Sequence, residues 1–255
     1  MTTMTRLGML TPSSNTALEP ITAAMLAGLP DVTAHFGRFR VTEIALTQGA
    51  LAQFDETAIL VAAELLSHAK VDVIAWNGTS SSWLGFDADE RLCERIRDTT
   101  GIQAATSVLA LNDILAMTGV QRLGLVTPYT GDVQDRIVAN YRRLGIACDP
   151  ERHFGIRDNF AFAEFGLNEI AGMIRAVGAG KPDAIAVVCT NMRAAPLVEE
   201  LERELGLPIY DSVATAVWKS LGLAGVDPAR VKGWGRVFAL PPTGGTLRSV
   251  VAPPP

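Results

Sequence analysis

A chain of 255 residues exceeds the usual single-domain size of about 100–150 residues, so it suits one large domain or two small ones. Hydrophobic residues make up 48% of it and charged residues 19%, a balance that excludes an intrinsically disordered chain. The net charge of −5 gives no basic excess, so neither nucleic acid nor an anionic membrane is expected as a partner.

Three segments of the chain recur in the same order and at similar spacing, which indicates an internal repeat. Each is typical of a short buried strand that ends in a turn or a polar cluster. The offsets drift only from 116 to 111 to 105 residues, as changes in loop length would produce. The pairs are RLGMLTP at 6–12 with RLGLVTP at 122–128, VDVIAWNGT at 71–79 with PDAIAVVCT at 182–190, and GIQAATSV at 101–108 with GLPIYDSV at 206–213.

Helical patterns lie between these strands, with apolar residues at helical spacing and acidic residues often at the start. They cover residues 56–69, 87–99, 132–144, 165–177 and 195–205. Strands that alternate with helices of about 10–15 residues predict parallel βαβ units with right-handed crossovers. The expected fold class is therefore α/β, with two pseudo-symmetric, doubly wound parallel-sheet halves and the active site in the cleft between them.

The repeat also predicts where the halves begin and end. Residues 1–115 form the first half and residues 116–214 the second. Residues 215–240 are expected to return and pack on the first half. The turn-rich residues 241–255 are expected to form a flexible tail.

Polar clusters follow four of the predicted strands, at the carboxyl ends where parallel α/β sheets bind ligands. These clusters are TPSSN at 11–15, NGTSSS at 77–82, TPYT at 127–130 and CTN at 189–191. Two halves related by a pseudo-twofold axis would face these clusters into one cleft, rich in hydroxyls, amides and backbone N–H groups. Such a cleft suits an anion, so a small mono- or dicarboxylate substrate is the expected partner.

The repeat aligns Gly78 with Cys189, because both stand at the end of the second repeated strand. One half therefore offers a thiol where the other offers no side chain. Two opposed thiols could remove a proton on one face of a substrate and return it on the other, whereas one thiol works from one side only. The asymmetry favours a reaction with a single stereodefined protonation, in which Cys189 is the central catalytic group and Gly78 its empty counterpart.

The other cysteines and the histidines lack such a context. Cys93 lies in the helical run DERLCERIRD and Cys148 in a connection before Pro150, so both are expected to be structural. The sequence has no CxxC pair and no HExxH-type spacing, so no metal is expected. It also has no signal-peptide pattern and no apolar stretch of about 18 residues, which makes a cytoplasmic location the expectation.

Together these segments resemble the aspartate/glutamate racemase superfamily, in particular its maleate cis-trans isomerase and arylmalonate decarboxylase branch. The markers are LGMLTPSSNTALEP, NGTSSSW, RLGLVTPYTGDV, IRDN at 156–159 and VVCTN. In that family two cysteines usually flank the substrate, while arylmalonate decarboxylases have glycine at the first position and cysteine only at the second. This sequence has that arrangement in Gly78 and Cys189, although its PSSN opening resembles maleate isomerase and CTN replaces a Gly-rich stretch.

Six polar residues make up the expected substrate-binding set: Thr79, Ser80, Tyr129, Asn15, Asn159 and Thr190. The resemblance implies that the first three donate hydroxyl hydrogen bonds to one carboxylate and stabilise the enediolate formed when the other leaves. It implies that the two asparagines hold a substrate carboxylate, as in the isomerases. Cys189, with a reference pKa of about 8.5, can then protonate the carbanion, and no electron-sink cofactor is needed.

The leading hypothesis is a cofactor-independent decarboxylase of a substituted aryl- or alkenylmalonate. The first alternative is a maleate cis-trans isomerase or an aspartate/glutamate-type racemase, in which something other than residue 78 supplies the second group. An alternative of another class is a carboxylate-binding protein without turnover. A homo-oligomer stays open, because no interface can be identified from the sequence.

Overall fold

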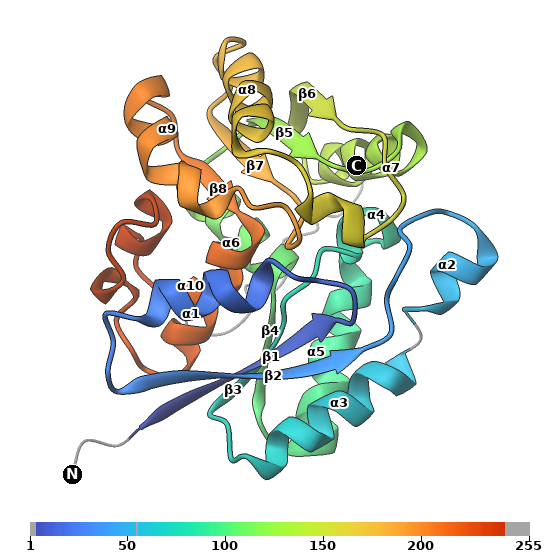
Figure 1. Cartoon of the computed structure of the whole chain (residues 1–255), viewed down its shortest axis with the longest axis vertical. Coiled ribbons are helices and arrows are strands. Elements are labelled where there is room, and N and C mark those ends of the chain that lie inside the picture. The colour runs from blue at the N-terminus through green and yellow to red at the C-terminus, as the bar shows by residue number, and fades with distance from the viewer. Residues whose placement is uncertain (1–3, 55, 243–255) are drawn as a thin grey trace, which may run out of the picture.

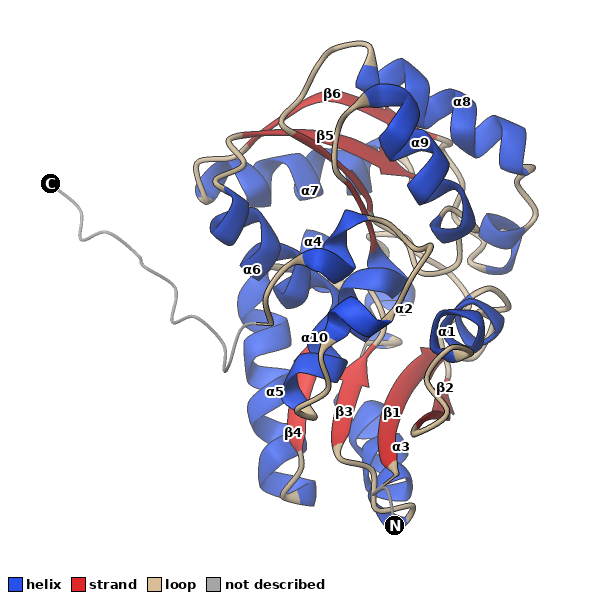
Figure 2. Cartoon of the chain, turned by 90° about the vertical axis from the view of Figure 1, so that its left-hand side faces the viewer, coloured by secondary structure: helices blue, strands red, loops and turns tan. Residues whose placement is uncertain are grey.

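The computed structural model describes residues 4–54 and 56–242 of the chain. These residues form two four-stranded parallel sheets with flanking helices, the first in the lower part and the second in the upper part of Figures 1 and 2. The arrangement confirms the predicted α/β class with two similar doubly wound halves. The predicted tail at 241–255 falls almost wholly outside the described residues, which end at Pro242.

The two sheets have the same strand order, β2-β1-β3-β4 in the first and β6-β5-β7-β8 in the second. All neighbouring strands are parallel, so each needs a crossover connection to return the chain to the same edge. The strands are β1 (Thr5–Pro12), β2 (Val32–Phe39), β3 (Val73–Trp76), β4 (Gln103–Thr106), β5 (Arg122–Thr127), β6 (Ala147–His153), β7 (Ala184–Val187) and β8 (Ile209–Asp211).

The sequence repeat extends to the register of the strands. Trp76 in β3 and Val187 in β7 pair with equivalent residues of β1 and β5, and the pairs keep the 116- and 111-residue offsets. Gly78 and Cys189 each follow two residues later. They therefore leave their strands at equivalent points, as the alignment of the repeats predicts.

Helices occur at all five positions predicted from periodicity, although the last begins as a 3-10 turn. They pack apolar faces against the sheets and against one another. The α-helices are α1 (Leu18–Leu26), α2 (Gln48–Ala52), α3 (Glu56–His68), α4 (Ser81–Leu84), α5 (Phe86–Thr100), α6 (Ser107–Thr118), α7 (Gly131–Arg143), α8 (Leu167–Gly178), α9 (Val198–Leu205) and α10 (Ser212–Leu223). The 3-10 helices are η1 (Phe160–Ala163), η2 (Ala195–Leu197), η3 (Pro228–Arg230) and η4 (Arg236–Ala239).

Helices α6 and α10 join the two halves. They pack against each other, and α10 contacts β3 and β4 of the first sheet although it follows β8 of the second. A buried ion pair links them, because Lys219 Nζ of α10 lies 2.7 Å from a carboxylate oxygen of Asp113 in α6. Helix α10 thus carries the chain from the second sheet back onto the first.

One predicted connection is in fact a strand. Cys148, expected in a connection, lies in β6 at the edge of the second sheet, and Pro150 follows it in the same strand. Proline is tolerated there because an edge strand forms ladder hydrogen bonds on one side only. The turn signal that proline gives in a sequence therefore led to the wrong assignment.

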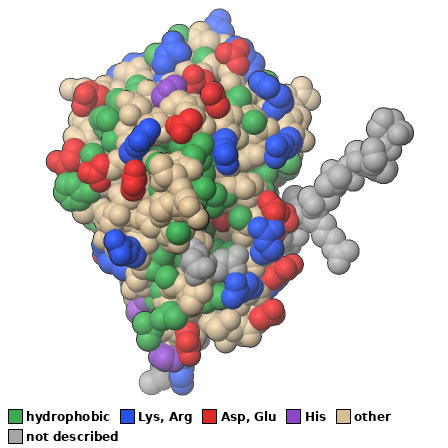
Figure 3. Space-filling model, turned by 90° about the vertical axis from the view of Figure 1, so that its right-hand side faces the viewer, with side chains coloured by type: hydrophobic (Ala, Val, Ile, Leu, Met, Phe, Trp, Pro, Cys, Tyr) green, Lys and Arg blue, Asp and Glu red, His purple; other side chains and the backbone are tan. Residues whose placement is uncertain are grey.

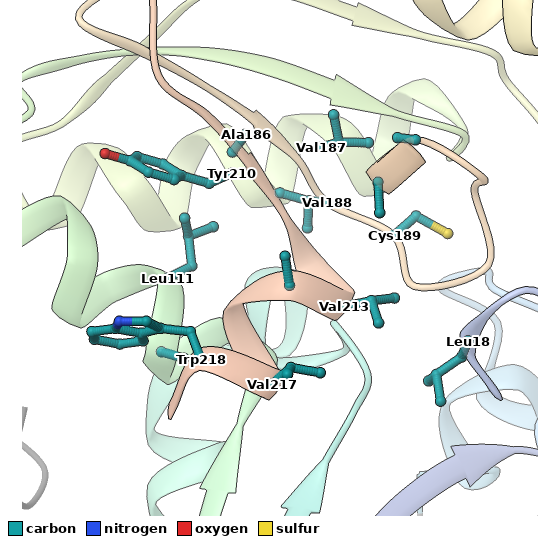
Figure 4. Packing of buried hydrophobic residues seen from close by; sticks show 14 of the residues in the cluster. Leu18, Leu111, Ala186, Val187, Val188, Cys189, Tyr210, Val213, Val217 and Trp218 are labelled. Carbon is teal, nitrogen blue, oxygen red and sulfur yellow. The ribbon is translucent and has the colours of Figure 1, made fainter. Parts of the chain in front are cut away.

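The hydrophobic core continues up to the loops that carry the predicted site. Val187 and Val188 pack in it with Leu111 of α6 and Val213 of α10 (Figure 4). Cys189 lies at the edge of this cluster, in the loop that leaves β7. Close packing on one side of the loop leaves the thiol little freedom of position.

Two features of the described residues bear on membranes and on the distribution of charge. Within residues 4–54 and 56–242, no helix is long and apolar enough to cross a membrane. On the face shown in Figure 3, basic and acidic side chains are interspersed without a large patch of one sign. This distribution agrees with the modest net charge of −5.

Candidate active site

A small cavity between the two halves brings together most of the predicted site. Its volume is about 20 Å³, room for about one water molecule. Seven of the eight predicted residues line it, and Asn15 does not. The lining consists of Pro12, Val41, Ile44, Phe54, Trp76, Gly78, Thr79, Ser80, Trp83, Tyr129, Asn159, Cys189 and Thr190.

Three larger surface hollows contain none of the predicted residues. They measure about 390 Å³ beside η4, about 540 Å³ beside α2 and about 250 Å³ between α7 and β6. Size alone is a weaker guide than chemistry, because the small cavity is the one that gathers the thiol and the hydroxyl donors. We therefore assign the candidate site to the small cavity.

The environment of Cys189 favours its neutral thiol. The residue is 2% exposed, and its sulfur accepts a hydrogen bond from the backbone N–H of Asn191 at 3.3 Å. Burial raises the pKa of Cys189 to about 12, against the smaller opposing effects of Asn191 and Tyr129. A thiol with this pKa keeps its proton at pH 7, so it is suited to donate one.

Tyr129 of the second half meets Thr79 of the first. Tyr129 Oη and Thr79 Oγ1 are 2.7 Å apart, and either can be the donor. The tyrosine ring is held by edge contacts with Trp83 and Phe162, at centroid distances of 5.0 and 5.5 Å. Burial raises the pKa of Tyr129 well above its usual value, so its hydroxyl stays neutral. Both hydroxyls can donate to an anion placed beside them.

The loop after β3 is braced by hydrogen bonds from both halves. Ser82 Oγ donates to the Thr79 carbonyl at 2.7 Å, and Asn140 Nδ2 of α7 donates to the Ser82 carbonyl at 2.9 Å. The Trp76 indole Nε1–H donates to Ser80 Oγ at 3.4 Å. These bonds fix the hydroxyls of Thr79 and Ser80 before any ligand arrives, which is the condition for preorganised stabilisation of charge.

Asn15 lies behind Thr190 rather than in the lining. Its Nδ2 donates to Thr190 Oγ1 at 3.1 Å. Its Oδ1 accepts from the backbone N–H groups of Ala17 and Leu18 at 3.0 and 2.9 Å. The amide of Asn15 thus connects the start of α1 with the threonine next to the catalytic candidate.

Asn191 ties the loop after β7 to the first half. Its Oδ1 accepts from the backbone N–H groups of Thr16 and Ala17 at 2.9 and 3.2 Å. Its Nδ2 donates to the Asn159 carbonyl at 2.5 Å. The sequence indicated Asn191 only as the last residue of the CTN cluster, and the structure adds this bridging position.

The segment from Arg40 to Phe54, which we call the cover segment, runs from β2 to α3 and closes one side of the cavity. It is joined to the second half by backbone hydrogen bonds. Ile44 N–H donates to the Arg157 carbonyl at 2.9 Å, and Asn159 N–H donates to the Thr42 carbonyl at 3.0 Å. The segment contributes apolar lining through Val41, Ile44 and Phe54.

The side chain of Gln53 folds the cover segment onto itself. Its Oε1 accepts from the backbone N–H and the hydroxyl of Thr42, at 2.7 and 3.1 Å. Its Nε2 donates to the carbonyls of Glu43 and Ala50, at 3.2 and 3.3 Å. One glutamine therefore joins the two ends of the segment that covers the site.

Two fully buried carboxyls stand behind the site loops. Asp211 caps α10, and its Oδ1 accepts from the backbone N–H groups of Val213 and Ala214 at 2.8 and 3.2 Å. Burial raises the pKa of Asp211 to about 7, and that of Asp89 in α5 likewise to about 7. A charge on Asp211 in turn raises the pKa of Cys189.

Most of the apolar lining could not be predicted from local patterns in the sequence. Val41, Ile44 and Phe54 come from the cover segment, whose path over the cavity depends on contacts with the second half. Trp76 could have been predicted to line the cavity. It precedes Gly78 by two residues, and alternate residues of an extended chain point to the same side. Trp83, the last residue of the NGTSSSW marker, also lies in the lining.

The described part of the chain contains no set of side chains that could bind a metal ion. No group of three or more His, Cys, Asp and Glu side chains converges there. The cavity itself offers a thiol and hydroxyl and amide groups.

Two repeated α/β halves with a cysteine and opposed hydroxyl donors in the cavity between them define a class of α/β enzyme. The arylmalonate decarboxylase family model matches residues 7–238, and the chain belongs to that family. Its relatives include a maleate isomerase from Pseudomonas putida, 26% identical over 240 residues, which cover 89% of this chain and 95% of the relative. They also include the arylmalonate decarboxylase of Bordetella bronchiseptica, 29% identical over 169 residues, which cover 65% of this chain and 70% of the relative.

Solved structures show the same fold. A maleate isomerase from Pseudomonas putida S16, in a cysteine-to-alanine variant with maleate, aligns with a TM-score of 0.85 at 27% identity, over 92% of this chain and 98% of that chain. An arylmalonate decarboxylase structure aligns with a TM-score of 0.73 at 24% identity, over 92% of this chain and 99% of that chain. The family relationship is shown, and the choice between the two activities depends on the site.

Proposed function

We propose that this protein is a cofactor-independent decarboxylase of a malonate with an apolar aryl or alkenyl substituent. The observation that carries the proposal is the single thiol of the cavity. Cys189 lines it from the second half, and at the equivalent point of the first half Gly78 has no side chain. A site with one proton donor suits a reaction that ends in one protonation from one side.

In the proposed reaction the bond between the α-carbon and one carboxylate breaks, and carbon dioxide leaves without the electron pair. The pair passes into the remaining carboxylate, which becomes an enediolate. Thr79, Ser80 and Tyr129 donate hydrogen bonds to its oxygens and lower the barrier as the charge develops. Cys189 gives its proton to the α-carbon, and the thiolate regains a proton from water when the product leaves.

The remaining polar residues fit around this core. We assign Asn159 and Thr190, which line the cavity, to the substrate, and Asn15 to the orientation of Thr190. The apolar side chains of Val41 and Ile44 offer the surroundings that an aryl or alkenyl substituent requires. A small carboxylate, with no cofactor, is the proposed partner.

The resemblance of the chain to maleate isomerases supports a different reaction, the isomerisation of maleate. The cavity has one cysteine for that reaction rather than two. A related maleate isomerase from Nocardia farcinica has been solved as a cysteine-to-serine variant with a covalent succinylcysteine intermediate. That enzyme therefore has a second cysteine that carries the adduct. In this chain Cys93 and Cys148 lie outside the cavity lining, so Cys189 would have to fill both roles.

The cavity of about 20 Å³ is too small for any of these substrates, because ligand pockets usually measure about 300–1,000 Å³. Entry requires part of the lining to move. The cover segment is the part that can do so by breaking a few hydrogen bonds across the cleft rather than by unpacking a sheet. We propose that it opens to admit the substrate and closes to exclude water.

The test is to incubate the purified protein, without added cofactor, with a panel of aryl- and alkenylmalonates and with maleate in deuterated water. Carbon dioxide and products are followed by NMR. We expect carbon dioxide and one deuterium at the α-carbon, with a rate that falls by about 10²–10⁴-fold in Cys189→Ala, the usual range for loss of a general acid. Cys148→Ala, which removes a buried thiol outside the cavity, is the matched control and should retain activity.

Conversion of maleate to fumarate without release of carbon dioxide would contradict the proposal. It would show that Cys189 alone supports isomerisation. Tight binding of a carboxylate without turnover would instead support the binding-protein alternative.

A further inference from the structure

The two halves of the site differ at two positions that lie two residues apart, and not only at the position of the cysteine. Trp76 and Val187 occupy equivalent places in β3 and β7, and Gly78 and Cys189 follow them at the same spacing. The first half thus has a large side chain followed by none, and the second has a small side chain followed by a thiol. Alternate residues of an extended chain point to the same side, so the members of each pair compete for the same space.

The indole of Trp76 fills the space that a side chain at position 78 would need. A Cβ built on Gly78 would lie 2.1, 2.4 and 2.5 Å from Cζ2, Cη2 and Cε2 of Trp76. Carbon atoms in contact lie about 3.5–4.0 Å apart, so the ring would have to move by more than an ångström. A glycine is therefore needed at position 78 because the Trp76 ring leaves no room for a side chain. Backbone conformation is not the reason, because Gly78 does not have a positive φ.

The ring cannot move freely to make that room. Trp76 is 1% exposed, and its ring packs against Phe39 at a centroid distance of 5.0 Å. Its Nε1–H is engaged with Ser80 Oγ at 3.4 Å. Displacing the indole would therefore disturb the core under β3 and release a hydroxyl of the proposed carboxylate site.

We propose that Trp76 is a specificity-determining residue, which excludes a side chain at position 78 and thereby restricts the cavity to one thiol. Residues 76 and 78 act as a pair, so that a second thiol can enter the site only after the indole is replaced by a smaller side chain. The catalytic consequence rests on the proposed function, whereas the steric coupling between the two positions does not.

The test is a double-mutant cycle of the full-length protein at positions 76 and 78. The variants are Gly78→Cys, Trp76→Val, which copies the valine of the second half, and their combination. Thermal unfolding gives the coupling, and mass mapping after iodoacetamide treatment gives the alkylation rate of the introduced thiol. Gly172→Cys is the matched control, because a Cβ at this α8 glycine meets no atom within 4 Å.

We expect Gly78→Cys alone to lower Tm by on the order of 5 °C, as overpacking of a core does in a protein of this size, while Gly172→Cys leaves Tm nearly unchanged. In the Trp76→Val background, Gly78→Cys should leave Tm unchanged or raise it, because the thiol fills part of the space left by the indole. If the cysteine variants fail to fold, Gly78→Ala in both backgrounds probes the same contact with a single added carbon.

The catalytic consequence has its own readout. With a prochiral arylmalonate, the wild-type enzyme should give one enantiomer, and the double variant a mixture, because a thiol then stands on each side of the carbanion.

A Gly78→Cys variant with the Tm of the Gly172→Cys control would overturn the inference. So would an equal Tm change in both backgrounds. Absence of decarboxylation in the wild type would refute the proposed function alone, since the Tm cycle needs no turnover.

Discussion

Cys189 combines burial with a hydrogen bond to its sulfur, and the two have opposite effects on its proton. The backbone N–H of Asn191 stabilises a thiolate, but the loss of water around the sulfur outweighs it, so that the pKa of Cys189 rises to about 12. A neutral thiol beside neutral hydroxyls leaves the cavity without a fixed negative charge. In the proposed reaction an anionic substrate meets the neutral thiol and hydroxyl donors, and the thiolate appears only after the proton has been transferred.

The raised pKa of Cys189 predicts the pH dependence of the reaction. The acid form of the thiol persists until pH approaches about 12, so kcat/KM should stay level between pH 7 and pH 9.5. A cysteine with an ordinary pKa of about 8.5 would lose about tenfold over the same range. The measurement is a kcat/KM profile with an arylmalonate. A decline centred near pH 8.5 would show that the thiol is not held as the structure indicates.

The Tyr129→Phe variant should distinguish the contribution of the Tyr129 hydroxyl to catalysis from that of its ring. The variant keeps the aromatic contacts with Trp83 and Phe162 but loses the donor that lies 2.7 Å from Thr79 Oγ1. Removal of one such donor usually costs about 10²–10³ in kcat. Steady-state kinetics measure the effect, and Tyr141→Phe, at a buried tyrosine outside the cavity, is the control. Equal kcat in wild type and Tyr129→Phe would remove the hydroxyl from the proposed machinery.

At the scale of elements, the cover segment closes the cavity although several of its residues are exposed. Gln53→Ala removes four hydrogen bonds, three of which join the two ends of the segment, each worth about 0.5–1.5 kcal/mol. The closed form should then be less populated, so KM should rise about tenfold or more with kcat changed less than twofold. Gln48→Ala, at an exposed glutamine of α2, is the control. A fall in kcat at constant KM would indicate that Gln53 acts on the chemical step instead.

The helices and buried strands could be predicted because their signals are local. Periodicity located α3, α5, α7 and α8 to within about two residues, and the repeat located both β3 and β7. The position of the cover segment could not be predicted, since it depends on hydrogen bonds between residues more than 100 positions apart, such as Ile44 with Arg157. Cys148 was misplaced for a related reason, because the tolerance of an edge strand for proline is a property of the sheet.

The same distinction applies to the candidate site. Residues that follow a strand end, such as Gly78, Tyr129 and Cys189, could be selected from the repeat because every parallel strand delivers its carboxyl end to one edge. The orientation of Asn15 toward Thr190 required knowledge of how α1 begins. The contact between Trp76 and Gly78 required the rotamer of a buried ring.

At the scale of the whole molecule, the fold is a duplicated unit whose copies have diverged where they meet. Thr106 and Asp211 occupy equivalent places as caps of α6 and α10, but only one of them ionises. The helices they begin cross between the halves and pair through the buried ion pair of Lys219 and Asp113. Removing one partner of a buried ion pair is usually strongly destabilising, so the contact between the halves is sensitive to both residues.

The buried carboxyl of Asp211 should make global stability depend on pH. Its pKa is about 7 in the folded protein and about 3.9 in an unfolded chain, so between pH 4 and pH 7 the native state holds a proton that the unfolded state has lost. The free energy of unfolding therefore falls as pH rises through this window, by up to about 1.4 kcal/mol per pH unit, and then levels off.

Asp211→Asn keeps a side-chain oxygen to cap α10 but removes the ionisation. Urea denaturation at pH 4, 6 and 8 should give nearly equal stability for variant and wild type at pH 4, and an increasingly more stable variant at pH 6 and pH 8. Asp227→Asn, at an exposed aspartate that caps η3, is the matched control and should leave the slope unchanged. If the Asp211→Asn curve runs parallel to the wild-type curve, Asp211 is ionised in the folded protein across the whole range, and the slope must come from Asp89 or another buried group.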